Sequence, residues 1–245
     1  PATDVAWLDA VRRRYGLAGR FILYVGTIEP RKNLRRLLEG FAARSRAGDL
    51  PHQLVCVGPY GWLCRDLEEQ IERLGIEHQV RFTGYVPFDD LPAIYNLAEM
   101  FVFPSLYEGF GLPVIEAMAC GTPVITGRVS SLVEVGGEAV EQVEELDAEC
   151  LGEAMVRIAR SREQRERMTA LGLARAAEFS WERAARATLA VYRCAARRAR
   201  GTISVTDNTA LPAAGRGARH EPAVASVGVE SMVSEPKRGL EPLEL

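Results

Sequence analysis

The chain has 245 residues, which suits one large domain or two small ones, and its 47% hydrophobic and 26% charged residues are typical of a folded globular protein. The formal net charge of −3 and the pI near 5.8 argue against a nucleic-acid binder, which normally has a dominant basic face. No apolar run approaches the roughly 18 residues that would predict a membrane-spanning helix.

The five cysteines and three histidines are scattered along the chain without a Cys-x-x-Cys pair, so neither a disulfide framework nor a zinc site is predicted. Thiols that stay reduced are typical of the cytoplasm. The first residues lack both an initiator methionine and the apolar core of a secretory signal. We therefore expect a cytoplasmic protein and a chain that is a fragment or a processed product.

Strand-length apolar runs alternate with helix-like segments in the first part of the chain. The runs are residues 21–28, 52–58, 80–86, 100–105 and 123–126. The helix-like segments between them are residues 33–45, 64–75, 89–98 and 113–121. This alternation predicts βαβ units, and the continuous apolar character of the runs predicts strands buried on both faces. The predicted fold class is therefore α/β, a Rossmann-like doubly wound parallel sheet.

Helices alone are predicted after residue 147, at residues 148–161, 163–179 and 181–200, with Ser180 as the N-cap of the last. The tail that follows is rich in Gly, Pro, Ser and Ala, which is typical of disorder. The predicted organisation is a lead-in segment (1–19), one Rossmann-like domain (20–200) and a disordered tail (201–245).

Two loops follow strands at the edge where doubly wound sheets bind ligands. In the first, Arg31 offers a rigid fork of donors and Lys32 a compact charge, and both suit a diphosphate at a helix start. In the second, residues 107–111, two glycines allow backbone N–H groups to approach a ligand. The alternative for the first loop is a pair of solvated charges.

Two carboxylates lie close to the start of the next helix: Glu108 inside this second loop, and Glu116 in the predicted first turn of that helix. A carboxylate accepts hydrogen bonds from two neighbouring sugar hydroxyls, so the pair suits a nucleotide sugar. The alternative is a helix-capping Glu116 and a surface Glu108. Other chemistries are disfavoured, because the chain has no G-x-G-x-x-G, no P-loop, no G-x-S-x-G and no D-x-D for a metal-bound diphosphate.

The segment from Glu108 to Glu116, EGFGLPVIE, resembles the E-x7-E element of retaining GT-B glycosyltransferases, most closely those of glycosyltransferase family 4. The resemblance covers roughly residues 20 to 200. Further motifs occur in the family's order at residues 23–33, 57–62, 80–87, 120–125 and 179–192.

This resemblance implies a donor-binding domain with specific roles. Glu108 would contact the transferred sugar, Glu116 the ribose diol, and Arg31 and Lys32 the diphosphate; Glu108, Arg31 and Lys32 would be the catalytic residues. The resemblance implies neither a metal nor another cofactor. The remaining implied donor-binding residues are Gly26, Tyr85, Val86, Gly109, Phe110, Gly111 and Leu112.

The chain departs from the family pattern in two places. Acidic residues occupy 138–149, where the family has its last apolar strand, so this strand and its helix packing are in doubt. We expect the acceptor-binding N-terminal domain to be missing from this chain, because residues 1–19 hold only a short lead-in helix. We therefore expect the chain to bind a nucleotide sugar but to transfer the sugar poorly on its own.

The implied reaction is transfer of a hexose from a nucleotide-diphosphate sugar to a glycan or a lipid-linked acceptor, through the missing domain. The E-P-R-K-N segment favours GDP-mannose, with UDP and dTDP sugars left open. The basic residues 196–200 could contact the inner membrane face peripherally. The interpretation as a solvated helix end is favoured over this contact. Two alternatives are a binding module that works with a separate acceptor subunit and an inactive remnant.

Overall fold

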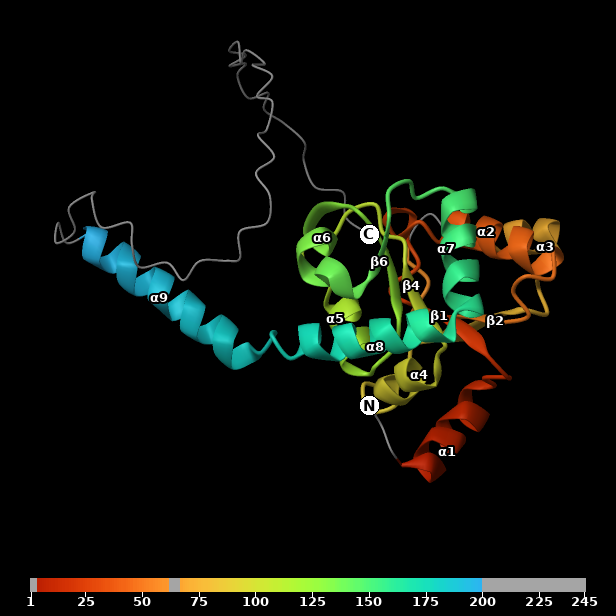
Figure 1. Cartoon of the computed structure of the whole chain (residues 1–245), viewed down its shortest axis with the longest axis horizontal. Coiled ribbons are helices and arrows are strands. Elements are labelled where there is room, and N and C mark those ends of the chain that lie inside the picture. Colours follow the sequence, from red (N-terminus) through yellow and green to blue (C-terminus); the bar gives the residue numbers. More distant parts are fainter. Residues whose placement is uncertain (1–3, 62–66, 200–245) are drawn as a thin grey trace, which may run out of the picture. The chain divides into compact units, whose positions relative to one another are not determined.

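The computed structural model describes residues 4–61 and 67–199, and the predicted tail 201–245 lies outside them (Figure 1). The chain divides into one compact unit that ends at Val191 and a second unit from Tyr192 onward. The fold below is that of the first unit. Within the described ranges, no helix is both long enough and apolar enough to cross a bilayer.

A six-stranded sheet forms the centre of the fold, in the order β3-β2-β1-β4-β5-β6, and every neighbouring pair is parallel. The prediction of a doubly wound α/β fold with C-terminal helices is confirmed. The strands are β1 (Phe21–Val25), β2 (Gln53–Val57), β3 (Val80–Gly84), β4 (Met100–Phe103), β5 (Val124–Gly127) and β6 (Glu141–Val143).

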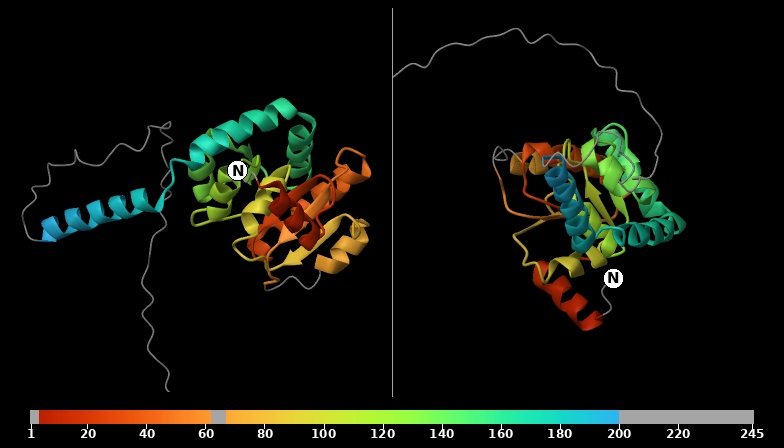
Figure 2. Two further views of the ribbon diagram at one scale, coloured as in Figure 1. Left: turned by 90° about the horizontal axis from the view of Figure 1, so that it is seen from below. Right: turned by 90° about the vertical axis from the view of Figure 1, so that its left-hand side faces the viewer.

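Helices cover both faces of this sheet, as Figures 1 and 2 show. The α-helices are α1 (Val5–Tyr15), α2 (Leu34–Arg46), α3 (Leu67–Leu74), α4 (Leu91–Leu97), α5 (Leu112–Ala119), α6 (Ser130–Gly136), α7 (Ala148–Arg160), α8 (Arg162–Ala176) and α9 (Trp181–Ala199). Two 3-10 turns are η1 (Pro30–Lys32) and η2 (Gly137–Ala139). The predicted cap of α9 is confirmed, because Arg183 N donates to Ser180 Oγ at 3.1 Å.

Strand β1 is apolar throughout because its successive side chains enter two different cores. In β1, Ile22 and Tyr24 pack beneath α2, α3 and α7, whereas Phe21, Leu23 and Val25 pack beneath α1, α4, α5 and α6. Helix α8 contributes to both cores and runs from one layer to the other (Figure 1). A polar substitution at any of these five positions would leave an unpaired group in an apolar core.

The last strand forms despite the acidic sequence that put it in doubt. Strand β6 pairs in parallel with β5, so that Glu141 lies opposite Ile125. At the edge of a sheet, one strand face can hold polar side chains while the backbone still makes its hydrogen bonds. Val143 supplies the buried contact, and Glu141 pairs with Arg157 of α7 at 2.7 Å. The helix packing doubted in the sequence therefore forms, with Val143 and the apolar face of α7 in one core.

Helices α2 and α7 approach each other so closely that their backbones touch. A Cβ built on Gly40 of α2 would lie 2.4 Å from the carbonyl oxygen of Ala148 and 3.1 Å from the amide nitrogen of Gly152. These neighbours are backbone atoms of a helix and cannot turn away. Glycine at position 40 is therefore required by the close contact of two helices, although it costs helix propensity.

We expect Gly40→Ala to lower the free energy of unfolding by about 2 kcal/mol, because relief of the clash must push α2 and α7 apart. Helix propensity alone predicts the opposite sign, since Ala stabilises an isolated helix relative to Gly. Urea denaturation measures the change. The control is Ala43→Ser on the exposed face of α2, which should be nearly neutral. A Gly40→Ala variant as stable as the parent would contradict the proposed contact.

Candidate functional site

The two predicted ligand loops meet at the carboxyl edge of the sheet. Leu106 N donates to Arg31 O at 2.9 Å, and Arg31 Nη1 donates to Tyr107 O at 2.6 Å. Since β1 and β4 are adjacent parallel strands, the loops that follow them leave the sheet side by side. The structure therefore brings residues 29–33 and 106–111 together.

Glu108 forms ion pairs with both predicted diphosphate ligands. Its Oε1 lies 2.6 Å from Lys32 Nζ, and its Oε2 lies 3.0 Å from Arg31 Nη1. The side chains of Lys32 and Glu108 are only 11% and 10% exposed. Burial opposes ionisation of Glu108, but the hydrogen bond and charge of Lys32, with Arg31, outweigh it and lower the pKa of Glu108 below its ordinary value. The carboxylate is ionised at neutral pH.

The surroundings of Lys32 hold its ammonium group in place. Lys32 Nζ lies 4.8 Å from the centre of the Phe103 ring, at the end of β4, in a cation–π contact. A Cβ built on Gly26 would lie 3.7 Å from Lys32 Cε, so this predicted residue borders the Lys32 side chain. Arg31 is more exposed, and its Nη2 donates to Glu29 Oε1 at 2.6 Å.

Asn33, a residue with a left-handed backbone conformation, also anchors the first loop. Asn33 follows η1 with a φ of 57°, and its Nδ2 donates to Leu146 O at 2.9 Å, in the segment between β6 and α7. The side-chain hydrogen bond compensates for a backbone conformation that asparagine tolerates better than most residues.

The second loop leads into the N-terminus of α5, where no side chain caps the helix. Gly111 precedes α5 with a φ of 103°, and a Cβ there would lie 2.6 Å from Leu132 Cδ2. Phe110 and Leu112 are exposed on either side of Gly111, and a Cβ on Gly109 would meet no atom within 4 Å. Uncapped amides at a helix start attract anions, which is the property predicted for this loop.

Two serines that sequence reasoning did not single out hold the second loop. Glu108 N donates to Ser130 Oγ at 3.0 Å, and Ser131 Oγ lies 2.9 Å from Glu108 O and 3.0 Å from Phe110 O. Both serines begin α6, and Ser130 has a φ of 44°, which is rare outside glycine. The only signal for them in the sequence was their place in the Ser-Ser-Leu segment after β5.

Glu116 differs from its predicted position. It is the fifth residue of α5 and lies one residue beyond the predicted first turn, because the helix begins at Leu112 and not at Pro113. Tyr95 Oη donates to Glu116 Oε2 at 3.1 Å. Burial and the charge of Glu116 raise the pKa of Tyr95, which keeps the phenol protonated as a donor. The alternative of a helix-capping Glu116 is wrong, since its side chain is held by Tyr95 of α4.

The segment predicted to contact a base has one exposed and one buried side chain. Tyr85 is 75% exposed, whereas Val86 is 6% exposed and packs in the core beneath α4 and α5. A contact from Val86 would therefore come from its backbone. Tyr60, which follows β2, packs against Phe82 with ring centres 5.5 Å apart and supports this end of β3.

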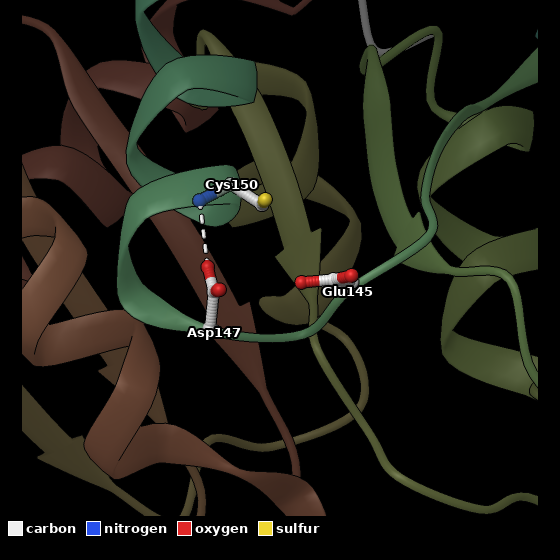
Figure 3. Close-up of side chains that lie close together, drawn as sticks. All are labelled: Glu145, Asp147 and Cys150. Carbon is white, nitrogen blue, oxygen red and sulfur yellow. Dashed lines mark hydrogen bonds between the residues drawn. The ribbon is translucent and has the colours of Figure 1, made fainter.

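A separate group of three possible metal ligands lies at the start of α7 (Figure 3). Glu145, Asp147 and Cys150 have ligand atoms within 4.8 Å of one another. Asp147 Oδ1 accepts the N–H of Cys150 at 2.8 Å, a helix cap that lowers the pKa of Asp147. Loss of hydration and the neighbouring carboxylates raise the pKa of the Cys150 thiol, which opposes the thiolate that a metal needs. The helix cap accounts for this group.

Comparison with known proteins gives the same family as the motifs. The family model described as glycosyl transferases group 1 matches residues 12–173. O-antigen chain mannosyltransferase B of Escherichia coli is 40% identical over 184 residues, which cover 75% of this chain and 48% of that protein. The chain thus spans about half the length of this relative.

Solved structures match the same region. Sucrose-phosphate synthase from Thermosynechococcus elongatus superposes with a TM-score of 0.67 and 31% identity, over 76% of this chain and 48% of that one. The C-terminal domain of the group 1 glycosyl transferase LpcC from Francisella tularensis superposes with a TM-score of 0.62 and 20% identity, over 73% of this chain and 93% of that domain. The chain therefore belongs to the glycosyl transferases group 1 family, which is glycosyltransferase family 4 of the GT-B fold, and corresponds to the C-terminal domain of its members.

Proposed function

We propose that this chain is the donor-binding domain of a retaining hexosyltransferase that uses a nucleotide-diphosphate sugar. The observation that carries the proposal is the meeting of Arg31, Lys32 and Glu108 beside the uncapped start of α5. Two cations and a helix N-terminus suit a diphosphate, and a carboxylate among them suits sugar hydroxyls.

The diphosphate would be held by the Arg31 guanidinium, the Lys32 ammonium and the amides of residues 109–112. As the bond from sugar to phosphate breaks, negative charge grows on the leaving diphosphate. Donors that are already oriented stabilise this charge more than the ground state, and this lowers the barrier to transfer. The low exposure of Lys32 supports this role, because an ion pair is stronger away from water.

The two ends of the donor would be held by different residues. Glu116, oriented by Tyr95, would accept hydrogen bonds from both ribose hydroxyls, and Tyr85 would lie against the base. Glu108 would face the hydroxyls of the transferred sugar. Along the sheet edge these residues follow the order of base, diphosphate and sugar in the donor, since Tyr85 follows β3, Lys32 follows β1 and Glu108 follows β4.

Mannose is the sugar that we favour, with GDP as the nucleotide, because O-antigen chain mannosyltransferase B is the 40% identical relative. The acceptor would be a glycan or a lipid-linked glycan at the inner face of the cytoplasmic membrane, bound by the half of the relatives that this chain does not span. The alternative is an acceptor subunit that is encoded separately, and an inactive remnant is opposed by the intact Arg31, Lys32, Glu108 and Glu116.

Calorimetric titration with GDP, UDP and dTDP in EDTA tests the proposal. Saturable binding of one nucleotide without metal would support a metal-independent donor site and identify the base. Absence of binding to all three by a folded chain would overturn the proposal. The same chain should transfer mannose from GDP-mannose poorly, and normal turnover would contradict the assignment of the acceptor site to a separate domain.

We expect Glu116→Ala to weaken nucleotide binding about tenfold, because two hydrogen bonds to the ribose are lost. Titration with the nucleotide and with its 2′,3′-dideoxy analogue measures the effect. The variant should lose affinity only for the ribonucleotide. Glu134→Ala, an exposed acid on α6, is the control and should leave both affinities unchanged. Equal losses for both ligands would contradict the ribose assignment.

We expect Ser131→Ala to lower the free energy of unfolding by about 1 kcal/mol and to weaken nucleotide binding, because the carbonyl groups of Glu108 and Phe110 lose a donor. Ser131→Thr keeps the hydroxyl and should restore most of the affinity. Hydrogen exchange of the amides at residues 108–112 reports the loop directly. Unchanged exchange in Ser131→Ala would contradict a role in holding the loop.

A further inference from the structure

The charged groups of the donor site neutralise one another in the free protein. Arg31 and Lys32 carry two positive charges, and Glu29 and Glu108 carry two negative charges within 3.0 Å of them. These four side chains therefore offer a diphosphate no net positive charge. This balance is unexpected for a site that should bind a multiply charged anion.

A bound diphosphate and the observed Glu108 carboxylate would compete for the same donors. Lys32 Nζ and Arg31 Nη1 face the two oxygens of Glu108, in the arrangement that two phosphate oxygens would take. Two anions cannot share these donors closely without strong repulsion in a site of low exposure. Binding of a diphosphate therefore favours departure of the Glu108 side chain from Lys32.

A carboxylate displaced in this way needs new partners, because an ionised and partly buried group without hydrogen bonds is costly. The hydroxyls of a sugar attached to the diphosphate can donate to it. A nucleoside diphosphate without a sugar offers no such donors.

We propose that Glu108 acts as an internal competitor of the diphosphate and determines specificity for the sugar-bearing donor over the bare nucleoside diphosphate. The proposal rests on the proposed function and assigns a further role to one residue of that site. With the sugar present, Glu108 exchanges its ion pairs for hydroxyl donors. After transfer, the sugar is gone, and Glu108 returns to Lys32 and Arg31 and displaces the nucleoside diphosphate.

The local structure allows the side chain to move while the backbone stays. Ser130 and Ser131 hold the backbone N–H and carbonyl group of Glu108. The neighbouring Gly109 leaves open space beside the loop. Glu29 can remain on Arg31 Nη2 in either state, because it uses a different nitrogen from Glu108. The exchange therefore needs only rotation of one side chain.

Glu108→Gln separates the two roles of this residue. Calorimetry on the 245-residue chain and the variant would use GDP with GDP-mannose and UDP with UDP-glucose, all in EDTA. The amide keeps hydrogen-bonding groups but loses the competing charge. We expect the affinity for the bare diphosphate to rise about tenfold, and the preference for the sugar-bearing form to fall by at least the same factor.

Glu29→Gln is the matched control, since it removes one negative charge from the same cluster but leaves Lys32 paired with Glu108. It should not change the preference between the two ligands. Glu108→Asp keeps the charge and withdraws it by one methylene, so it should shift the preference in the same direction as Glu108→Gln and by less. This second variant serves where Glu108→Gln does not fold.

The outcomes separate this proposal from the proposed function. Binding of the sugar-bearing donor with no gain in bare diphosphate affinity in the Glu108 variants would overturn the competitor role and leave donor binding intact. An equal change of preference in Glu29→Gln would also overturn it, since the effect would then be one of general charge. Absence of binding to all four ligands by the folded parent chain would overturn both proposals.

Discussion

The reversal of strand order between β1 and β4 is the constraint on which the candidate site depends. These two strands lie side by side although β2 and β3 come between them along the chain, and the helices that follow them turn to opposite faces of the sheet. The loops at their carboxyl ends are therefore left uncovered and adjacent. Without this reversal, Lys32 and Glu108 would not meet, and neither group would be stable at its present low exposure.

The meeting of these loops explains why charged residues are tolerated at the edge of an apolar sheet. A buried lysine costs free energy unless an anion and further contacts replace the water it loses. In this protein Glu108 and the Phe103 ring replace that water. The same arrangement makes the site responsive, because any ligand that takes the lysine must also satisfy the carboxylate. Stability of the free fold and selectivity for a ligand are thus linked through one ion pair.

Sequence alone predicted the parallel sheet, since runs such as 21–28 and 100–105 are apolar at nearly every position and leave no solvent-facing side. It also predicted that Arg31, Lys32 and Glu108 lie at the carboxyl edge of the sheet. It did not predict their ion pairs, because pair formation depends on side-chain directions in loops that have no period. The serines of α6 were missed for the same reason.

Strand β6 and Glu116 show the limits of pattern in the regular elements. The short edge strand lacks the apolar signal of its neighbours, because the backbone ladder and one buried valine suffice there. The helix start moved by one residue, and this was enough to place Glu116 in the second turn rather than the first. Helix ends depend on local caps, and a Gly-Leu-Pro segment allows more than one start.

The hydrogen bond from Asn33 to Leu146 makes the two loops of the site differ in how firmly they are anchored. This hydrogen bond joins the Arg31–Lys32 turn to the segment before α7. Helix α7 in turn packs against the backbone of α2 at Gly40. The loop of Arg31 and Lys32 is therefore anchored to the two closely packed helices. The loop that carries Glu108 is held by the hydroxyls of two serines, Ser130 and Ser131. With the proposed roles, adaptation to a different sugar would alter the loop of Glu108 first, while the loop of Arg31 and Lys32 could remain unchanged across donors of different chemistry.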